Sequence, residues 1–180
     1  YDLRGDVIER AAAAGIRLII SVDMGIRAFA AAETARRLNV DLIVTDHHLP
    51  GPDGVPKALA VINPNQSGCE YPCKSICGAG VAFKLAQALL ERKRPGKDLS
   101  ALLRSFLKIV AIATIADSVP LTDENRVFAK IGLDSLRTAV NPGLKSLLEI
   151  AELSGRPLSA GEVAFRIAPR INAAGRMDVA

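Results

Sequence analysis

The chain has 180 residues, of which 49% are hydrophobic and 23% are charged, and its formal net charge is +4. This composition is that of a globular domain with enough apolar material for a core, and it excludes disordered and collagen-like chains. The longest apolar run, residues 109–116, is far shorter than the roughly 20 residues that a membrane span needs. Three cysteines, an odd and low number, and the lack of a signal segment favour a cytoplasmic protein that does not contact a membrane.

The two ends of the chain and its charge distribution are also informative. The chain begins at Tyr1 rather than Met and ends directly after a dense motif, so we expect a piece of a longer protein. Residues 1–50 hold six Lys/Arg and seven Asp/Glu, whereas residues 51–180 hold 17 and 12. This asymmetry suits a metal site beside a polyanion-binding surface, although any basic globular domain could show it.

The first 65 residues alternate between helix and strand patterns. Apolar residues at helical spacing predict helices over Leu3–Ala14 and Arg27–Leu38, and short apolar runs predict strands over Leu18–Val22, Leu42–Thr45 and Ala60–Ile62. The first of these runs is nearly all apolar, as in a strand that is covered on both faces. Strands separated by helices predict right-handed crossovers, and therefore a Rossmann-like α/β fold with a parallel sheet and flanking helices.

From Gly78 onward the pattern is helical. Five helices are predicted, and a basic linker, Arg92–Lys97, separates the first from the second. We therefore expect an α/β portion over residues 1–93 and a mainly helical continuation over residues 94–180. The predicted helices are Ala79–Arg92, Leu99–Ala116, Asp123–Ala139, Gly143–Leu153 and Ser159–Ile167.

Polar side chains follow the first two predicted strands. Asp23 comes directly after the first strand, and Asp46, His47 and His48 come directly after the second. Ligands of open α/β sheets bind beyond the carboxyl ends of the strands, so these groups are expected to lie close together. Imidazole with carboxylate suits Mn²⁺ or Zn²⁺. Neighbouring side chains on an extended backbone point to opposite sides, which predicts that His48 faces away from an ion held by His47. A surface loop with two solvated imidazoles is the alternative.

Two later segments also carry polar groups. Asp117 ends the most apolar helix, where a buried carboxylate needs a partner or a metal, although solvation at the helix end is an equal alternative. Arg170, Asn172 and Arg176 lie among small residues in a predicted loop, where guanidinium groups could bind phosphate. A structural turn with solvated arginines is the other interpretation of this loop.

Six segments, taken in order, resemble the DHH phosphoesterase superfamily, and within it the RecJ-type single-strand-DNA-specific exonucleases. The resemblance implies a two-metal, Mn²⁺- or Mg²⁺-dependent phosphodiesterase that degrades single-stranded DNA from the 5′ end into mononucleotides in recombination and repair. Its partners would be single-stranded DNA and, for the longer protein, a single-strand-binding protein and a helicase. The segments are Ser-Val-Asp23-Met-Gly-Ile, Thr-Asp46-His47-His48, Val-Ile-Asn63-Pro-Asn65, Gly78-Ala-Gly-Val-Ala-Phe83, Ile-Ala-Asp117-Ser-Val-Pro-Leu and Arg170-Ile-Asn-Ala-Ala-Gly-Arg176-Met.

The same resemblance implies roles for the residues of the predicted metal site. Asp23 resembles the carboxylate that bridges two ions, and His47 and Asp117 resemble further ligands. Asp46 would be a ligand or would hold His47 in the right tautomer. His48 would lie near the scissile phosphate, while the two ions stabilise charge on the attacking and leaving oxygens.

The resemblance also implies a phosphate site and two parts that this sequence does not contain. Arg176, with Arg170 and Asn172, would hold a substrate phosphate. The family's Asp-x-Asp strand should lie before Tyr1, and its DHH-associated domain after Ala180. We therefore expect an incomplete metal pair, and little or no nuclease activity from these 180 residues alone.

Several alternatives stay open. Cys69, Cys73 and Cys77 invite a metal-cluster interpretation, but a structural zinc site needs a second pair of ligands, so we expect reduced thiols.

The function could be that of another DHH branch, such as a short-oligonucleotide or nucleoside-bisphosphate phosphatase, or of a non-catalytic DNA-binding scaffold. The chain has no Trp, two Tyr and five Phe, so any DNA binding should be mainly electrostatic and salt-sensitive.

Overall fold

The computed structural model describes residues 3–138 and 141–177, and for residues 175–177 it describes the backbone alone. The chain divides into two compact units, Tyr1–Leu85 and Ala86–Ala180, each with its own apolar core. The division falls inside helix α3 (Gly78–Lys93), whose C-terminal end is where we expected the α/β portion to stop. None of the described helices has the length and apolar character of a membrane span.

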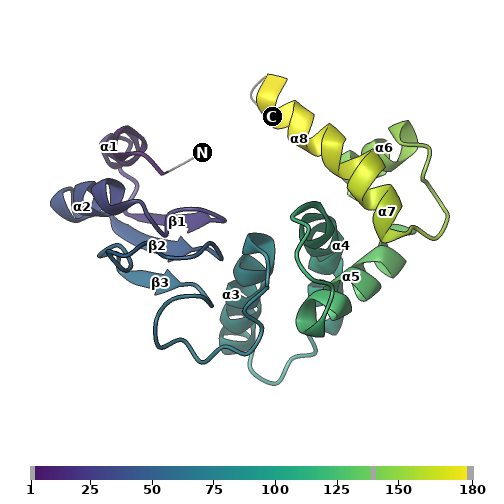
Figure 1. Ribbon diagram of the computed structural model, residues 1–180, viewed down its shortest axis with the longest axis horizontal. Helices are drawn as coiled ribbons and strands as arrows, with labels where there is room; N and C mark the ends of the chain where they lie inside the picture. Colours follow the sequence, from purple (N-terminus) through teal and green to yellow (C-terminus); the bar gives the residue numbers. More distant parts are fainter. Residues whose placement is uncertain (1–2, 139–140, 178–180) are drawn as a thin grey trace. The chain divides into compact units, whose positions relative to one another are not determined.

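The first unit is built on a three-stranded parallel sheet in the order β1-β2-β3, which confirms the predicted α/β fold (Figure 1). Val22 pairs with Thr45, and Thr45 pairs with Ile62, so the carboxyl ends of the strands are level. Side chains that follow the strands are therefore presented at one edge of the sheet. Its elements before α3 are α1 (Gly5–Ala13), β1 (Leu18–Val22), α2 (Phe29–Arg37), β2 (Asp41–Thr45) and β3 (Ala60–Ile62).

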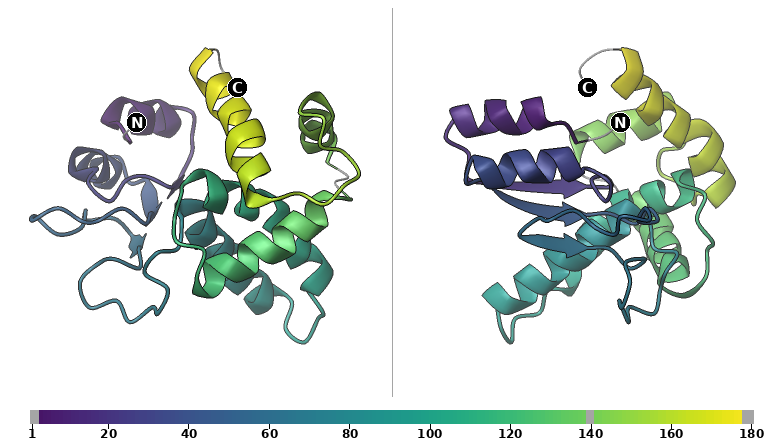
Figure 2. Two further views of the ribbon diagram at one scale, coloured as in Figure 1. Left: turned by 45° about the vertical axis from the view of Figure 1, so that its right-hand side comes forward. Right: turned by 60° about the vertical axis from the view of Figure 1, so that its left-hand side comes forward.

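Helices α1 and α2 cover one face of this sheet (Figures 1 and 2). Ile8 of α1 and the alanines of α2 bury themselves against Leu42 and Val44 of β2. On the opposite face Leu18, Ile20 and Val22 are 43 to 50% exposed. The prediction that β1 is covered on both faces is therefore wrong for the described residues, because only the face that carries Ile19 packs against the core formed with α1 and α2.

A tight turn links β1 to α2 and fixes the start of the site. Asp23 has a φ of 63° and Gly25 a φ of 108°, and Ser21 Oγ donates a hydrogen bond to Met24 O over 2.9 Å. A Cβ on Gly25 would lie 3.0 Å from Ser21 Oγ and 3.3 Å from a methyl group of Val44. Glycine therefore lets the chain reverse against β2, and this reversal leaves Asp23 at the end of the strand.

The second unit is helical. Helices α4 and α5 pack side by side (Figure 2). Gly132 of α5 allows close contact with Leu107 and Ala111 of α4. Ile112, Leu136 and other apolar side chains from several helices form the core of the unit. The helices are α4 (Ser100–Ala116), α5 (Asp123–Leu136), α6 (Pro142–Ile150), α7 (Ala160–Glu162), the π-helical turn η1 (Val163–Ile167) and α8 (Ala168–Met177).

The last three helical elements follow one another without a break from Ala160 to Met177. The predicted end of a helix at Ile167 and the predicted loop over Arg170–Met177 are therefore wrong. The physical reason lies in η1, where the Ala168 N–H bonds to Val163 O, five residues back. Pro169 has no N–H, and its ring would crowd the carbonyl four residues back, so the wider π-type turn lets the helix continue through the proline.

Candidate metal centre

Asp23, His47 and His48 lie together at the carboxyl ends of β1 and β2. One ligand atom from each of the three side chains lies within 4.8 Å of the others, and His47 Nε2 is 3.2 Å from Asp23 Oδ1. Level, parallel strand ends produce this proximity, so the spatial prediction from the sequence is confirmed. One carboxylate and two imidazoles now share one small volume.

Asp46 supports this group from inside the protein. Its side chain is 1% exposed, and Oδ2 accepts from the Ile26 N–H over 2.9 Å. Oδ1 accepts from the N–H groups of His47 and His48 over 2.7 and 3.2 Å. Burial raises the pKa of the Asp46 carboxyl, but the donors from Ile26, His48 and His47 together outweigh burial and hold the pKa below its ordinary value. Asp46 is therefore a buried carboxylate that organises the loop.

The ring of His48 is oriented by a contact with Asp46. His48 Nδ1 lies 2.6 Å from Asp46 Oδ1, and a carboxylate acceptor places the ring proton on Nδ1. Nε2 of His48 is then the nitrogen that can bind an ion, as in carboxylate–histidine–metal arrangements. The expectation that Asp46 holds the ring of His47 is therefore corrected, since the structure pairs Asp46 with His48.

The two imidazoles lie on the same side of the loop. Their ring centroids are 4.5 Å apart, and His48 is one of the three grouped ligand residues. The prediction that His48 faces away from an ion held by His47 rests on the assumption that the two side chains point to opposite sides of an extended backbone, and this assumption is therefore wrong. Alternation of side chains holds only for extended backbone, and after Thr45 the two histidine N–H groups turn toward Asp46 Oδ1.

Two asparagines from the segment after β3 hold the backbone of this loop. Asn63 Nδ2 donates to His48 O over 2.9 Å, and Asn65 Nδ2 donates to His47 O over 2.7 Å. Asn63 Oδ1 accepts from the Asn65 N–H over 2.7 Å, and Asn63 is 1% exposed. Both histidine carbonyls thus accept hydrogen bonds from the segment after β3, in which Asn63 is buried and Asn65 half-buried. No role for these amides was predicted, although their position after a neighbouring parallel strand was a usable signal.

Helix α3 begins against Asp23. Gly78 is buried, and a Cβ on it would lie 2.1 Å from Asp23 Oδ1 and 2.6 Å from Asp23 Cβ. Only a residue without a side chain leaves Asp23 in its observed position. The Gly78-Ala-Gly segment of the sequence is therefore part of the support of the site.

The donor set fits a divalent transition metal. Ligand atoms that bind one ion at about 2.0–2.2 Å lie roughly 3–4 Å apart, which is near the 3.2 Å between His47 Nε2 and Asp23 Oδ1. Two imidazoles and a carboxylate suit Mn²⁺ better than Mg²⁺, which prefers oxygen ligands. The group opens into a hollow of about 700 Å³ that Arg27 also lines. Arg27 was not predicted to belong to the site, and its guanidinium donates to Leu49 O over 3.1 Å.

The other predicted site residues lie in the second unit. Asp117 follows the last residue of α4 and is exposed. Arg170 and Asn172 are exposed residues of α8, and Arg170 Nη1 donates to Arg166 O over 2.5 Å. Arg176 belongs to the same helix, but its side chain lies outside the described part of the chain. The metal and phosphate roles of these four residues stay predictions.

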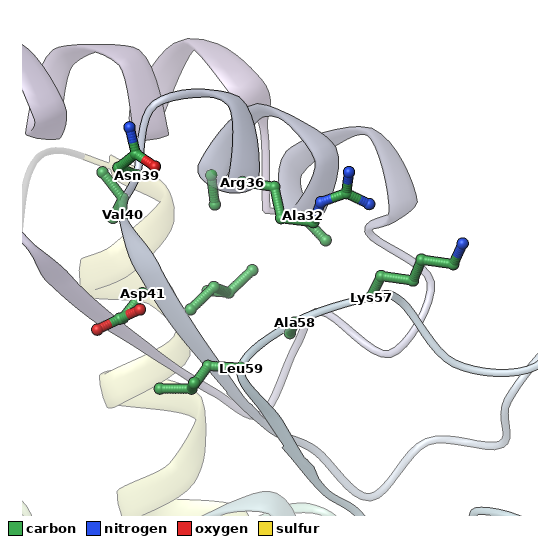
Figure 3. Close-up of a pocket in the computed structure, with 10 residues that line it drawn as sticks. Ala32, Arg36, Asn39, Val40, Asp41, Lys57, Ala58 and Leu59 are labelled. Carbon is green, nitrogen blue, oxygen red and sulfur yellow. The ribbon is translucent and has the colours of Figure 1, made fainter.

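A second hollow of the first unit lies at the opposite, amino ends of the strands (Figure 3). Its volume is about 510 Å³, its inner wall is formed by residues such as Ala32 and Val40, and Arg36 and Lys57 lie at its rim. The described residues that line it include no imidazole or thiol. The three cysteines Cys69, Cys73 and Cys77 form no disulfide among the described residues.

These features define a class of protein, and the chain belongs to the DHH family. The model of the DHH family N-terminal domain matches residues 3–114. Among curated proteins, the single-stranded-DNA-specific exonuclease RecJ of Escherichia coli K12 is 43% identical over 185 residues, which cover 99% of this chain and 32% of that protein. RecJ of Bacillus subtilis 168 is 45% identical over 166 residues, which cover 92% of this chain and 20% of that protein.

Solved structures give the same family. A crystal structure of exonuclease RecJ bound to manganese matches with a TM-score of 0.83 and 37% identity, covering 98% of this chain and 43% of that one. RecJ of Thermus thermophilus in complex with Mn²⁺ matches with a TM-score of 0.79 and 36% identity, covering 97% of this chain and 25% of that one. The chain thus spans about a third or less of the length of the curated relatives named above.

Proposed function

We propose that the chain forms the metal-binding part of a single-stranded-DNA-specific exonuclease that degrades DNA from the 5′ end into mononucleotides in recombination and repair. The observation that carries this proposal is the grouping of Asp23, His47 and His48 around one point, with Asp46 buried behind them. Relatives named single-stranded-DNA-specific exonuclease, at 43 and 45% identity, support the choice of substrate.

In this proposal Asp23, His47 and His48 hold Mn²⁺ or Mg²⁺. The ions supply Lewis acidity that stabilises the charge on the attacking and leaving oxygens of a phosphodiester. Asp46 holds the ring proton of His48 on Nδ1, and so keeps Nε2 directed to the ion. Arg27 lines the same hollow, where its cation can attract the phosphates of the substrate.

The same proposal assigns metal and phosphate roles to the predicted site residues of the second unit. Asp117 would add a carboxylate to the metal pair, and Arg170, Asn172 and Arg176 would hold a substrate phosphate. A cytoplasmic location and association with a single-strand-binding protein and a helicase belong to the same proposal. Because the metal pair would need further carboxylates, we expect at most weak nuclease activity from these 180 residues.

The test is a titration of the chain with Mn²⁺, followed by electron paramagnetic resonance. His47→Ala should abolish specific Mn²⁺ binding, because it removes one of three ligands from the grouped set. Asp41→Asn is the matched control, since Asp41 is an exposed carboxylate at the opposite end of β2. Equal Mn²⁺ binding by the parent chain and His47→Ala would contradict the metal site and favour a non-catalytic scaffold.

A second measurement separates the exonuclease from other DHH branches. A protein of the relatives' length should remove nucleotides successively from long 5′-phosphorylated single strands. Activity restricted to oligonucleotides of about two to five residues would instead indicate the short-oligonucleotide branch. His47→Ala in that longer protein should remove either activity.

A further inference from the structure

The densest run of positive charge in the chain is the basic turn, which we define as residues 92–97. Arg92, Lys93, Arg94 and Lys97 place four cations in six residues that contain no acid. The whole chain has 23 Lys/Arg and 19 Asp/Glu, so these four residues account for its formal charge of +4. The proposed metal chemistry uses none of them.

The basic turn has a defined shape. It connects the end of α3 to the start of α4, and it is closed by hydrogen bonds from Arg94 N to Leu90 O and from Lys97 N to Arg94 O, over 2.9 and 3.2 Å. Gly96 has a φ of 71°, in the left-handed region that favours glycine. Lys93, Arg94 and Lys97 line one hollow of about 560 Å³, together with Pro95, Asp98 and Leu99. Three exposed cations thus converge on one concave surface.

The cations of the basic turn differ from other arginines of the chain in their partners. Arg4 and Arg10 pair with Asp6, Arg36 pairs with Glu33, and Arg37 pairs with Glu9. Among the described residues, none of the four cations of the basic turn forms an ion pair or a side-chain hydrogen bond, and all four are exposed. Their charge is therefore available to an external anion.

The two nearest acids in the sequence, Glu91 and Asp98, accept hydrogen bonds from neutral N–H groups rather than from the cations of the basic turn. Glu91 Oε1 accepts a hydrogen bond from Gln87 Nε2 over 2.9 Å. Asp98 Oδ1 accepts from the Ser100 N–H over 2.9 Å, and this bond lowers the pKa of the Asp98 carboxyl. Asp98 is an adverse charge on one wall of the hollow, which three cations also line.

We propose that the basic turn is a binding surface for the phosphate backbone of single-stranded DNA. The inference rests on the proposed function for the identity of the polyanion. The geometry of the basic turn does not depend on the metal centre. A turn of fixed backbone presents Lys93, Arg94 and Lys97 to successive phosphates, and each contact releases counterions from the strand. The low aromatic content of the chain agrees with binding by charge instead of base stacking.

The experiment compares two triple variants with the same loss of charge. Lys93→Gln, Arg94→Gln and Lys97→Gln are combined in one chain, and Arg4→Gln, Arg10→Gln and Arg36→Gln in the control. Affinity for a fluorescent oligo-dT is measured by anisotropy in EDTA at several salt concentrations, so neither metal binding nor hydrolysis contributes. All six side chains are exposed, and circular dichroism verifies that both variants are folded.

The proposal predicts a specific change in salt dependence. Loss of three phosphate contacts should lower the slope of log K against log salt by about 2, at roughly 0.7 for each contact with a single strand, and should weaken binding roughly 100-fold at 0.1 M salt. The control variant should keep the slope of the parent chain. The proposal would be overturned by an equal loss of affinity in both variants or by an unchanged slope in the variant of the basic turn. It would also be overturned if the parent chain did not bind the oligonucleotide at low salt. Because the assay contains EDTA, a failed metal site does not affect its outcome.

Discussion

The two units of the chain solve the problem of buried polar groups in different ways. In the first unit Asp46 and Asn63 are buried and bond to backbone groups of other segments, across 15 to 20 residues of sequence. In the second unit the buried Thr114 and Asn125 bond to backbone groups only four or five residues away, from Thr114 Oγ1 to Val110 O over 2.7 Å and from Asn125 Nδ2 to Pro120 O over 3.0 Å. The cluster of buried side chains that forms the core of the second unit is apolar.

This difference predicts which substitutions change only the stability of the fold and which also change metal binding. In the first unit the hydrogen bonds that hold the loops together also orient the candidate ligands, so one substitution should change both the fold and metal binding. In the second unit the contacts between α4 and α5 stabilise the helices, and none of the grouped metal ligands belongs to either helix. Substitutions in the two units should therefore give distinguishable effects.

The largest effect should come from Gly132 in the second unit. A Cβ there would lie 2.2 Å from Leu107 O and 2.3 Å from Ala111 Cβ, so Gly132→Val forces α4 and α5 apart. We expect the free energy of unfolding to fall by about 3 kcal/mol, measured by urea denaturation. Gly161→Ala is the control, because its nearest atom lies 3.9 Å away. If the free energy of unfolding fell as little as in the control, the contact between α4 and α5 at Gly132 would not be as close as the structure shows.

Gly78→Ala should have the next largest effect, this time on the metal site. The added Cβ would overlap the side chain of Asp23, so the carboxylate must move away from His47. We expect Mn²⁺ affinity to fall roughly 100-fold, the upper range for loss of a supporting group. Gly51→Ala, with no atom within 4 Å of the new Cβ, should leave affinity unchanged. Unchanged affinity in Gly78→Ala would mean that Asp23 is not a ligand.

Asn65→Asp should weaken metal binding less, because it acts through the backbone. The substitution keeps the shape but replaces the donor to His47 O with an oxygen, which repels that carbonyl. We expect Mn²⁺ affinity to fall about tenfold and the ¹⁵N chemical shifts of the His47 ring to change.

Asn125→Asp is the matched control for this variant. Asn125 is also buried, and its Nδ2 donates to Pro120 O over 3.0 Å in the second unit. The control should lower stability without changing the histidine spectrum. Identical histidine spectra for the parent chain and Asn65→Asp would remove Asn65 from the positioning of the site.

The grouping of Asp23 with the two histidines could be predicted because it depends on local patterns and one general rule. Short apolar runs locate the strands, and parallel strands bring their carboxyl ends to one edge. The orientation of His48 could not be predicted in this way. It depends on the carboxylate of Asp46, which turns the backbone after the strand and accepts from the ring.

Two predictions about the fold are wrong for similar physical reasons. The exposed face of β1, with Leu18 and Val22, depends on which face of the sheet α1 and α2 cover, and composition alone does not encode that choice. The helix over Arg170–Met177 depends on the π-type turn before Pro169, whereas small residues and a proline favour a loop prediction. Both outcomes follow from neighbouring elements and not from the local sequence.

The smallest effect should come from the capping box at the start of α7. Arg156 donates to Glu162, the Ser159 N–H donates to Glu162 Oε2 over 2.9 Å, and these bonds lower the pKa of the Glu162 carboxyl to about 2. A lowered pKa in the folded state stabilises the fold above the ordinary value near 4.5, and this contribution is lost as the pH falls toward 2. The thermal melting temperature of the parent chain should therefore exceed that of Glu162→Gln above about pH 5. The difference should shrink between pH 4.5 and about 2. Ser159→Ala removes the Ser159 Oγ–H donor to Glu162 Oε2, which lies 3.0 Å away, and should raise the midpoint of Glu162 titration, measured by carboxyl ¹³C shifts. A midpoint near 4.5 in the parent chain would contradict the bonds to Glu162.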